Sequence, residues 1–273
     1  MTGRFVSFDP LRTLHIPHVI ALKPEQWLSR KDLIQAADWI LFPEYWQINA
    51  LVYGWKKKIF PSISSFYIGH DKVEMTRTFQ AVCPQNTPVT QILAHTDTAV
   101  EQILDAFYFP FVAKEIRNSM GQGVFLIETR KDFLDYAGNN SVLYVQEYLD
   151  IRRDLRLVLV GNQVVTGYWR QAAPGQFHNN VSRGGAVSFE NIPEGAVRLV
   201  ESFAGETGID HAGFDVAEVD GHFYFLEFNT RFGTRALTGR GIQLSPYILS
   251  YLNETKFDPP LDRTVERTLH PVP

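Results

Sequence analysis

The stretch His211–Arg235, HAGFDVAEVDGHFYFLEFNTRFGTR, decides the fold of this chain. Two runs rich in Val, Phe and Tyr flank the pair Asp220-Gly221, which is a strong local signal for a β-hairpin. Each expected strand carries one acid among apolar neighbours, Asp215 in the first and Glu227 in the second. Burying a carboxylate is costly unless a cation or hydrogen-bond donors compensate it. The two acids together therefore indicate a shared cation.

The length of the hairpin loop decides whether the two acids lie on the same face. A two-residue loop at Asp220-Gly221 would pair Asp215 with Leu226 and leave Glu227 on the other face. A three-residue loop with a Gly bulge shifts the register by one and brings Asp215, Glu227 and Asn229 together, and we predict this loop. Three oxygen donors on one face suit a hard ion such as Mg²⁺. The alternative is that the two acids pair with nearby arginines or face solvent.

The hairpin also resembles a known family. Phe-Asp-Val followed twelve residues later by Glu-Phe-Asn is similar to the metal-binding hairpin of the ATP-grasp superfamily. The likeness is greatest to the ribosomal-protein-S6-modifying and glutathione-synthetase-like carboxylate–amine ligases, and it covers roughly Asp71 to Leu249. It implies an ATP-grasp fold of the α/β (α+β) class. It also implies ATP and two Mg²⁺ ions, for which Mn²⁺ could substitute, with Asp215, Glu227 and Asn229 as the metal ligands.

Composition bounds the remaining possibilities. A chain of 273 residues can form two or three small α/β units with cores of their own. A hydrophobic fraction of 45% and a net charge of −4 give no basic excess that would indicate nucleic acid. Cys83 is the single cysteine, which excludes a disulfide framework. We find no apolar run of about 18 residues that could span a membrane and no apolar signal core, so we predict a cytoplasmic protein.

The expected domains follow from the position of the resemblance. Residues 1–70 are expected to form a short, Rossmann-like α/β domain and residues 71–273 the ATP-grasp domain. Within the latter we expect a lid subdomain at about 88–148 and a C-terminal metal and substrate subdomain at about 149–260. In the N-terminal domain, Gln47–Trp55 is predicted to be a helix. The aromatic residues Tyr53 and Trp55 and the preceding Trp46 are expected in the core, because aromatic residues at helical spacing are more often core residues.

Two lysines are candidates for phosphate binding. Asp71 is a plausible N-cap for a helix, and Lys72 stands where the family's Asp-Lys pair places an ATP-phosphate lysine. Lys114 lies in the β-prone run Phe107–Ile116, where a lysine either extends to the surface or neutralises an anion. A Gly-rich turn and a second strand, Val124–Glu128, come next, and this order resembles the ATP-grasp lid. The resemblance implies ATP contacts from Lys114, Gly121, Gln122 and Gly123.

The strand predicted over Ser141–Leu149 resembles the hinge that binds adenine in the family. This similarity implies that the adenine is contacted by Gln146, Glu147, Tyr148 and Leu149. A hairpin turning at Gly161-Asn162 follows, in which Asp154 and Arg156 share one face of a strand. By resemblance, Asp154 contacts the ribose or supports the site, and Arg156 positions an acidic substrate.

Two further segments supply catalytic candidates. QFHNNVSRGG resembles the family's Ser-Asn-x-x-Arg-Gly-Gly loop, which implies substrate binding by Asn180 and a grip on the transferring phosphoryl group by Arg183. An amphipathic helix over Pro193–Gly208 then leads into the hairpin. After the hairpin, Thr-Arg-Phe-Gly resembles the carbamoyl-phosphate-synthetase and biotin-carboxylase branch, which makes Arg231 a second catalytic candidate.

The function that this resemblance implies is an ATP-dependent ligase that joins a carboxylate to an amine or similar nucleophile through an acyl phosphate. The expected partners are ATP and a small-molecule or peptide substrate, and related ligases commonly self-associate as homo-oligomers. Two alternatives stay open. One is an ATP-grasp kinase that phosphorylates a small hydroxyl substrate. The other is a nucleotide-binding protein with little turnover.

Overall fold

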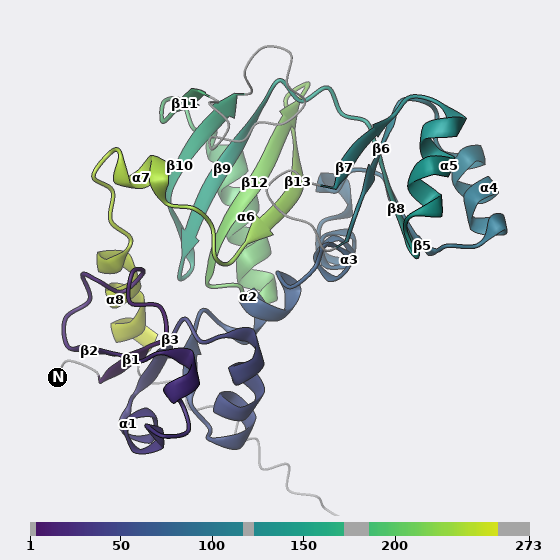
Figure 1. Ribbon diagram of the computed structural model, residues 1–273. Helices are drawn as coiled ribbons and strands as arrows, with labels where there is room; N and C mark the ends of the chain where they lie inside the picture. Colours follow the sequence, from purple (N-terminus) through teal and green to yellow (C-terminus); the bar gives the residue numbers. More distant parts are fainter. Residues whose placement is uncertain (1–3, 117–122, 172–185, 256–273) are drawn as a thin grey trace, which may run out of the picture. The chain divides into compact units, whose positions relative to one another are not determined.

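The computed structural model describes residues 4–116, 123–171 and 186–255 of the chain, and Figure 1 shows its helices and strands. Its contacts form two compact units. One comprises the described residues up to Phe60 together with those from Ser245 onward, and the other runs from Pro61 to Leu244. The helix α8 (Ser245–Glu254) thus groups with the N-terminal residues. The domain boundary that the sequence suggests, between residues 70 and 71, stays a prediction.

The N-terminal unit is built on a four-stranded parallel sheet in the order β2-β1-β3-β4. Parallel strands need crossover connections, and short helical segments supply those from β2 to β3 and from β3 to β4, which gives the Rossmann-like arrangement that the sequence predicts. The strands are β1 (Phe5–Ser7), β2 (Val19–Ala21), β3 (Trp39–Leu41) and β4 (Lys58–Phe60). The helical segments between them are η1 (Pro24–Gln26), α1 (Lys31–Ala36), η2 (Tyr45–Gln47) and η3 (Ala50–Gly54).

The helix predicted over Gln47–Trp55 is present, but it is not a regular α-helix. Residues 45–54 form a 3₁₀ turn, η2, two α-helical residues, 48 and 49, and a π-helical turn, η3. The 3₁₀ and π turns do not have 3.6 residues per turn, so the spacing argument that placed Trp46, Tyr53 and Trp55 in the core does not apply. Trp46 and Tyr53 are 56% and 58% exposed. Trp55 is partly buried and lies against Trp27, with ring centroids 5.1 Å apart.

In the second unit, the predicted lid corresponds to a four-stranded antiparallel sheet in the order β5-β8-β6-β7. The helices α4 (Asp97–Ala106) and α5 (Arg130–Gly138) lie together on one side of it (Figure 1). Their apolar residues share a core with those of the strands. The sheet positions Lys114 at the end of one central strand. Its strands are β5 (Thr90–Ala94), β6 (Phe111–Lys114), β7 (Val124–Ile127) and β8 (Val142–Glu147).

A five-stranded antiparallel sheet forms the rest of this unit, in the order β11-β10-β9-β12-β13. One of its faces packs on α3 and α6, and the shared core includes Phe79 and Phe203 from these helices. The strands are β9 (Arg153–Val160), β10 (Gln163–Gln171), β11 (Ala186–Ser188), β12 (His211–Val219) and β13 (His222–Asn229). The helical segments are α2 (Ile63–Ile68), α3 (Lys72–Val82), η4 (Pro84–Asn86), α6 (Glu194–Thr207) and α7 (Arg235–Thr238).

Two helix predictions in this unit are confirmed by their caps. Asp71 precedes α3, and its Oδ1 accepts hydrogen bonds from the backbone N–H groups of Val73 and Glu74 at 2.8 and 2.9 Å. The helix α6 ends at Gly208, which has a φ of +73°. A glycine adopts this left-handed conformation without the steric cost of a Cβ. None of the helices in the described ranges is long and apolar enough to cross a membrane.

The loop predicted for the hairpin of β12 and β13 is wrong, although the predicted pairing of Asp215 with Glu227 is correct. Val219 lies opposite His222, so the loop has two residues, Asp220 and Gly221, with φ of +51° and +78°. Positive φ at both positions is typical of a tight hairpin turn. The register then shifts inside the strands, where Val216 faces Phe225 but Asp215 faces Glu227. A bulge at Leu226, and not a longer loop, therefore brings Asp215 and Glu227 to the same face.

A second bulge changes the register of β9 and β10. Gln163 lies opposite Val160, but the pairing shifts between Val164 and Thr166. As a result Arg170 lies opposite Asp154. Without the extra residue, Asp154 would face Trp169, whose side chain belongs to the hydrophobic core.

We expect the substitution Gly221→Ala to lower the free energy of unfolding by about 1–2 kcal/mol, because an L residue is strained at its positive φ. The added Cβ would meet no atom within 4 Å, so the effect comes from the backbone alone. Gly205→Ala is the matched control. It also lies in open space, but inside α6, and should raise the stability by up to about 1 kcal/mol. Urea unfolding measures both, and shifts of the same sign would contradict the turn conformation.

Candidate active site

One face of the five-stranded sheet carries a row of charged side chains. The register places Arg156 on β9 opposite Asp215 on β12, and Arg170 on β10 opposite Asp154 on β9. Residues directly opposite each other lie on the same face, and alternate residues of a strand point to opposite faces. The alternate residues of these strands belong to the core against α3 and α6. The charged side chains therefore lie on the face of the sheet away from that core.

Asp215 is held by two arginines. The side chain is 7% exposed, and both of its oxygens accept hydrogen bonds from Arg156, from Nε at Oδ1 and from Nη2 at Oδ2. The second of these bonds is 3.0 Å long. Nη2 of Arg170 lies 2.9 Å from the same Oδ2. Two guanidinium groups thus surround this one carboxylate.

Arg170 also binds Asp154 and so bridges the two carboxylates. Its Nε donates to Oδ1 of Asp154 at 2.6 Å, and its Nη2 donates to Oδ2 at 2.9 Å. Asp154 and Arg170 are each 7% exposed. The two carboxylates and the two guanidinium groups compensate each other's charge in a region with little water. We refer to Asp154, Arg156, Arg170 and Asp215 as the Arg–Asp network.

The two carboxylates of the network differ in their protonation equilibria. Burial raises the pKa of Asp154 to about 6, although Arg170 opposes this shift. Burial also acts to raise the pKa of Asp215, but the charges of Arg156 and Arg170 outweigh it and hold that pKa below its ordinary value. Asp215 therefore keeps its negative charge at neutral pH, which a metal ligand or a counter-ion needs.

Glu227 and Asn229 complete the predicted donor set. They lie two residues apart on β13, so they share the face on which Glu227 faces Asp215. Nδ2 of Asn229 donates to Oε1 of Glu227 at 3.2 Å. This bond uses the amide nitrogen of Asn229 and not its amide oxygen. Carboxylate and amide oxygens suit Mg²⁺. In the described part of the chain, no cluster of three His, Cys, Asp or Glu side chains is placed to hold a metal. The predicted site has two carboxylates and an amide.

Lys114 is held in place by the lid sheet. Its Nζ donates to Oε1 of Gln146 at 2.7 Å and lies 5.5 Å from the ring centroid of Tyr144. Nε2 of Gln146 in turn donates to Oγ1 of Thr90 at 2.8 Å. The hydroxyl groups of Tyr144 and Thr76 are 2.7 Å apart, which connects β8 to α3. A lysine oriented in this way presents its charge at a defined point.

The pKa of Lys114 reports its surroundings. Burial lowers it to about 8, Glu227 opposes this shift, and Lys72 adds to it. Lys114 is thus close enough to both Glu227 and Lys72 to interact with each of them electrostatically. Lys72 begins α3, and Thr76 follows one turn later on the same helix. The structure therefore brings three of the predicted site residues, Lys72, Lys114 and Glu227, into one charged region.

The predicted adenine hinge spans the end of β8. Gln146 is 5% exposed and binds Lys114. Glu147 is the last residue of the strand, and its Oε1 accepts a hydrogen bond from the backbone N–H of Val89 at 2.7 Å. Tyr148, which is 39% exposed, and Leu149 follow the strand that we had predicted to include them. The contact of these residues with adenine stays a prediction.

Four of the predicted site residues lie outside the described residues, namely Gly121, Gln122, Asn180 and Arg183. Gly123 has a φ of +70°, and its carbonyl accepts a hydrogen bond from the backbone N–H of Glu115 at 2.7 Å. This bond continues the pairing of β6 and β7 by one residue beyond Lys114 and Val124. The contact of Gly123 with phosphate stays a prediction.

Arg231 lies two residues after the end of β13 and is exposed. Its neighbours Thr230 and Phe232 are 8% and 3% exposed. Oγ1 of Thr230 donates to the carbonyl of Ser65 at 2.8 Å, and the ring of Phe232 lies 5.3 Å from that of His211. The backbone on both sides of Arg231 is thus fixed. Its catalytic role stays a prediction.

The sequence analysis missed Arg170. This arginine follows a tryptophan near the end of a strand, and a regular hairpin at Gly161-Asn162 would have turned it toward the core face. Only the bulge between Val164 and Thr166 places it opposite Asp154. An arginine at a position that a regular register would bury in an apolar core is the one signal that could have suggested a bulge.

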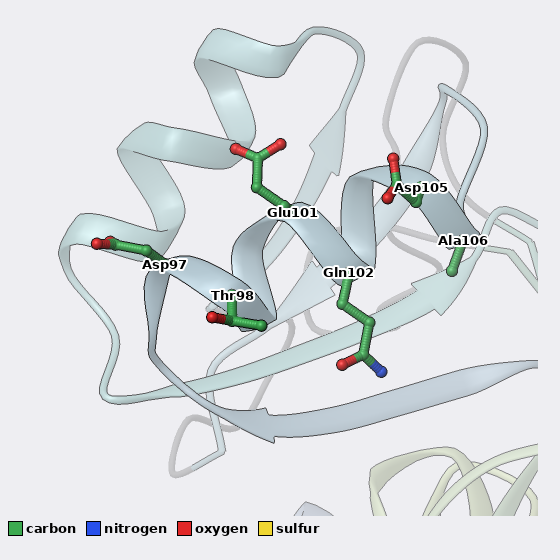
Figure 2. A pocket seen from close by; sticks show the side chains of 6 residues that line it. All are labelled: Asp97, Thr98, Glu101, Gln102, Asp105 and Ala106. Carbon is green, nitrogen blue, oxygen red and sulfur yellow. The ribbon is translucent and has the colours of Figure 1, made fainter.

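A depression of about 740 Å³ lies along the outer side of α4 (Figure 2). It is lined by Asp97, Thr98, Glu101, Gln102, Asp105 and Ala106. Figure 2 shows that all six side chains come from this one helix. Its three carboxylates would repel phosphate groups, so it does not suit a nucleotide. The Arg–Asp network and the region of Lys114 and Glu227 remain the candidate active site.

We expect Gly213→Ala to disturb the network. A Cβ at this residue of β12 would lie 3.0 Å from Nη1 of Arg156 and 2.8 Å from Cγ of the Phe232 ring. Both neighbours are buried, so the substitution should lower the free energy of unfolding by about 1–3 kcal/mol. In Gly233→Ala the added Cβ meets no atom within 4 Å, which makes it the control. If both variants melt at the wild-type temperature, the close packing around Arg156 is wrong.

We also expect one lysine to lose its charge near pH 8. Burial lowers the pKa of Lys114, so its amine should be charged below about pH 8 and neutral above it. NMR of the reductively ¹³C-methylated protein follows each lysine as the pH rises from 6 to 11. The signal with the low midpoint should vanish in Lys114→Met and persist in Lys131→Met, whose lysine is exposed on α5. A Lys114 signal that titrates with the surface lysines would rule out a desolvated amine.

The sequence matches a known family over the region that carries this site. The model of the RimK-like ATP-grasp domain matches residues 71–252. A probable alpha-L-glutamate ligase of Enterobacter sp. (strain 638) is 30% identical over 185 residues, 64% of this chain and 62% of that protein. A ribosomal protein bS6–L-glutamate ligase of Escherichia fergusonii is 32% identical over 170 residues, 59% of this chain and 56% of that protein. The chain therefore spans less than two thirds of the length of these curated relatives.

The fold agrees with this match. The crystal structure of a RimK domain protein ATP-grasp from Sphaerobacter thermophilus DSM 20745 is similar with a TM-score of 0.67 at 14% identity. The likeness covers 91% of this chain and 99% of that one. At this identity it shows the fold alone, which is the ATP-grasp fold that the sequence predicts. Because the family model covers most of the chain, this protein belongs to the RimK-like ATP-grasp family.

Proposed function

We propose that this protein is an ATP-dependent ligase that joins a carboxylate to an amine or a similar nucleophile. One observation carries the proposal: the partly desolvated Lys114 interacts electrostatically with both Glu227 and Lys72 inside the region that matches the family. Lysines neutralise the oxygens of a polyphosphate, and a carboxylate holds the divalent ion that accompanies it. Two curated relatives are named as glutamate ligases, which favours ligation over other uses of ATP.

For ATP we propose contacts on both sides of this region. Lys72 and Lys114 bind phosphate oxygens, and the bond from Lys114 to Gln146 orients the ammonium toward them. The end of β8 and the residues after it receive the adenine, and Asp154 supports the ribose side. The full set is Lys72, Lys114, Gly121, Gln122, Gly123, Gln146, Glu147, Tyr148, Leu149 and Asp154.

For the metal we propose Mg²⁺, with two ions and with Mn²⁺ as a substitute. The donors are hard oxygens, as this ion requires. Glu227 and Asn229 fit this role because they lie on one face of one strand. Asp215 fits it in part, because both its oxygens already accept N–H groups of arginines. When bound, the ion neutralises charge on the phosphate oxygens.

For phosphoryl transfer we propose Arg183 and Arg231 as the catalytic residues, and Arg156 and Asn180 as residues that bind the acidic substrate. Guanidinium groups bind carboxylates and phosphates bidentately, which suits the activation of a carboxylate as an acyl phosphate. An amine would then displace the phosphate. Arg156 makes such a bidentate pair with Asp215 in this structure. Its contact with substrate therefore requires a change in that pair.

The substrates are proposed only as classes. The names of the two relatives mention glutamate and, in one case, a ribosomal protein. An amino acid, a peptide or a protein terminus can each supply the carboxylate or the amine. A homo-oligomeric state and a cytoplasmic location stay predictions from the sequence.

The test of this function is a phosphate-release screen over pairs of amino acids and peptides, with mass spectrometry of the products. We expect Glu227→Gln to keep the fold and to lower turnover by about 10²–10³, because a neutral amide replaces an anionic metal ligand. Glu218→Gln is the matched control. It lies on the same hairpin, 3.8 Å from Arg153, and should keep wild-type turnover. Near-normal turnover in Glu227→Gln would contradict the metal assignment.

The products of the wild-type protein separate the three functions. A ligase yields an amide and free phosphate. A kinase yields a stable phosphoester, and a binding protein yields neither product while still binding ATP. An amide product from any pair establishes the proposal, whereas a phosphoester as the main product overturns it.

A further inference from the structure

The Asp215 carboxylate has little capacity left for a metal. An ionised carboxylate offers about four lone pairs. Oδ1 accepts Nε of Arg156, and Oδ2 accepts Nη2 of both Arg156 and Arg170. One lone pair, on Oδ1, is therefore all that remains. In addition, an ion at this carboxylate would be repelled by two guanidinium groups within a region of low dielectric constant.

The two arginines hold Asp215 in different ways. Arg156 donates from Nε and Nη2 to the two oxygens of Asp215, so this carboxylate is its bidentate partner. Arg170 makes two bonds to Asp154 and one additional contact to Asp215. If the additional contact breaks, Arg170 still has a bidentate partner and its charge stays compensated. The contact between Arg170 and Asp215 is thus the one that the network can give up at the lowest cost.

We propose that Arg170 is a positioning residue that competes with a divalent ion for Oδ2 of Asp215. An ion then binds first to Glu227 and Asn229, and it gains Asp215 as a full ligand only when Arg170 turns entirely to Asp154. This inference rests on the proposed function in one respect, since it takes the hairpin as a site for the metal of a metal–nucleotide complex. Its consequence is weak binding of the ion alone, because the triphosphate must supply the charge that displaces Arg170.

A purely structural role is the alternative reading of the same contacts. Asp154 and Arg170 would then join β9 to β10, and their loss would change the stability of the sheet but not the affinity for a metal. Stability alone cannot separate the two roles. The affinity for an ion in the absence of nucleotide can.

The test uses the full chain, Mn²⁺ alone as the probe, and electron paramagnetic resonance to measure free Mn²⁺. The double variant Asp154→Asn with Arg170→Met removes one charge of each sign, so no buried charge is left unpaired. We expect its affinity for Mn²⁺ to rise by about tenfold, since one charged hydrogen bond no longer competes for Oδ2. The matched control is Glu101→Gln with Arg130→Met, an exposed ion pair on the lid helices, whose removal should leave the affinity unchanged.

Every result decides the proposal. An affinity that stays within about twofold of the wild-type value, in a double variant that still unfolds cooperatively, overturns it. A lower affinity also overturns it, because Arg170 would then be holding Asp215 in the position of a ligand. If the double variant does not fold, Arg170→Lys takes its place. An ammonium can pair with Asp154 but cannot bridge two carboxylates with a planar fork, so affinity should still rise, and no rise overturns the proposal.

Failure of the inference and failure of the proposed function give different results. If the wild-type protein forms an amide and the Mn²⁺ affinity does not change in the variants, the inference alone is wrong. If no amide forms with any substrate pair but the affinity rises, the function is wrong and the competition at Asp215 stands.

Discussion

The structure depends on the compensation of four charges on one face of a sheet. Asp154, Arg156, Arg170 and Asp215 come from three adjacent strands and are at most 7% exposed. Removing one partner from such a buried pair typically costs about 3–5 kcal/mol, because an uncompensated charge stays behind. Loss of a single charged side chain from the network is therefore strongly destabilising. The network keeps Asp215 ionised and holds it directly across from Glu227, on the face of the sheet that carries the candidate site.

Two bulges make this arrangement possible. One, at Leu226, allows Phe225 and Phe228 to enter the core while Glu227 stays on the face of Asp215. The other, between Val164 and Thr166, turns Arg170 to Asp154 and Trp169 to the core. Each inserts one residue and so exchanges the two faces for the rest of its strand. In both strands, the bulge thus places apolar side chains in the hydrophobic core and charged side chains on the opposite face.

The four-stranded antiparallel sheet contributes a positive charge, that of Lys114. Lys114 is held by Gln146 at the end of a central strand, and the hydroxyl groups of Tyr144 and Thr76 connect that sheet to α3. Since Thr76 lies one turn after Lys72, this contact relates the positions of the two lysines. Burial makes the amine of Lys114 easier to deprotonate, and an arriving anion would reverse that effect. A negatively charged group next to Lys114 would therefore raise its pKa and keep the amine charged.

The sequence by itself determined the family, several of the helices and strands, and the candidate residues of the site. These predictions came from local features, namely apolar periodicity, the caps of α3 and α6, and the spacing from Asp215 to Glu227. Each such feature lies within one short stretch of sequence. Tertiary structure decided the registers. In the structure the β12–β13 hairpin has a two-residue loop, and its bulge lies within β13. The bulge in β10 makes Arg170 part of the candidate site. A bulge is chosen by what both faces of a sheet must pack against, and its position depends on contacts between strands that no single stretch of sequence contains.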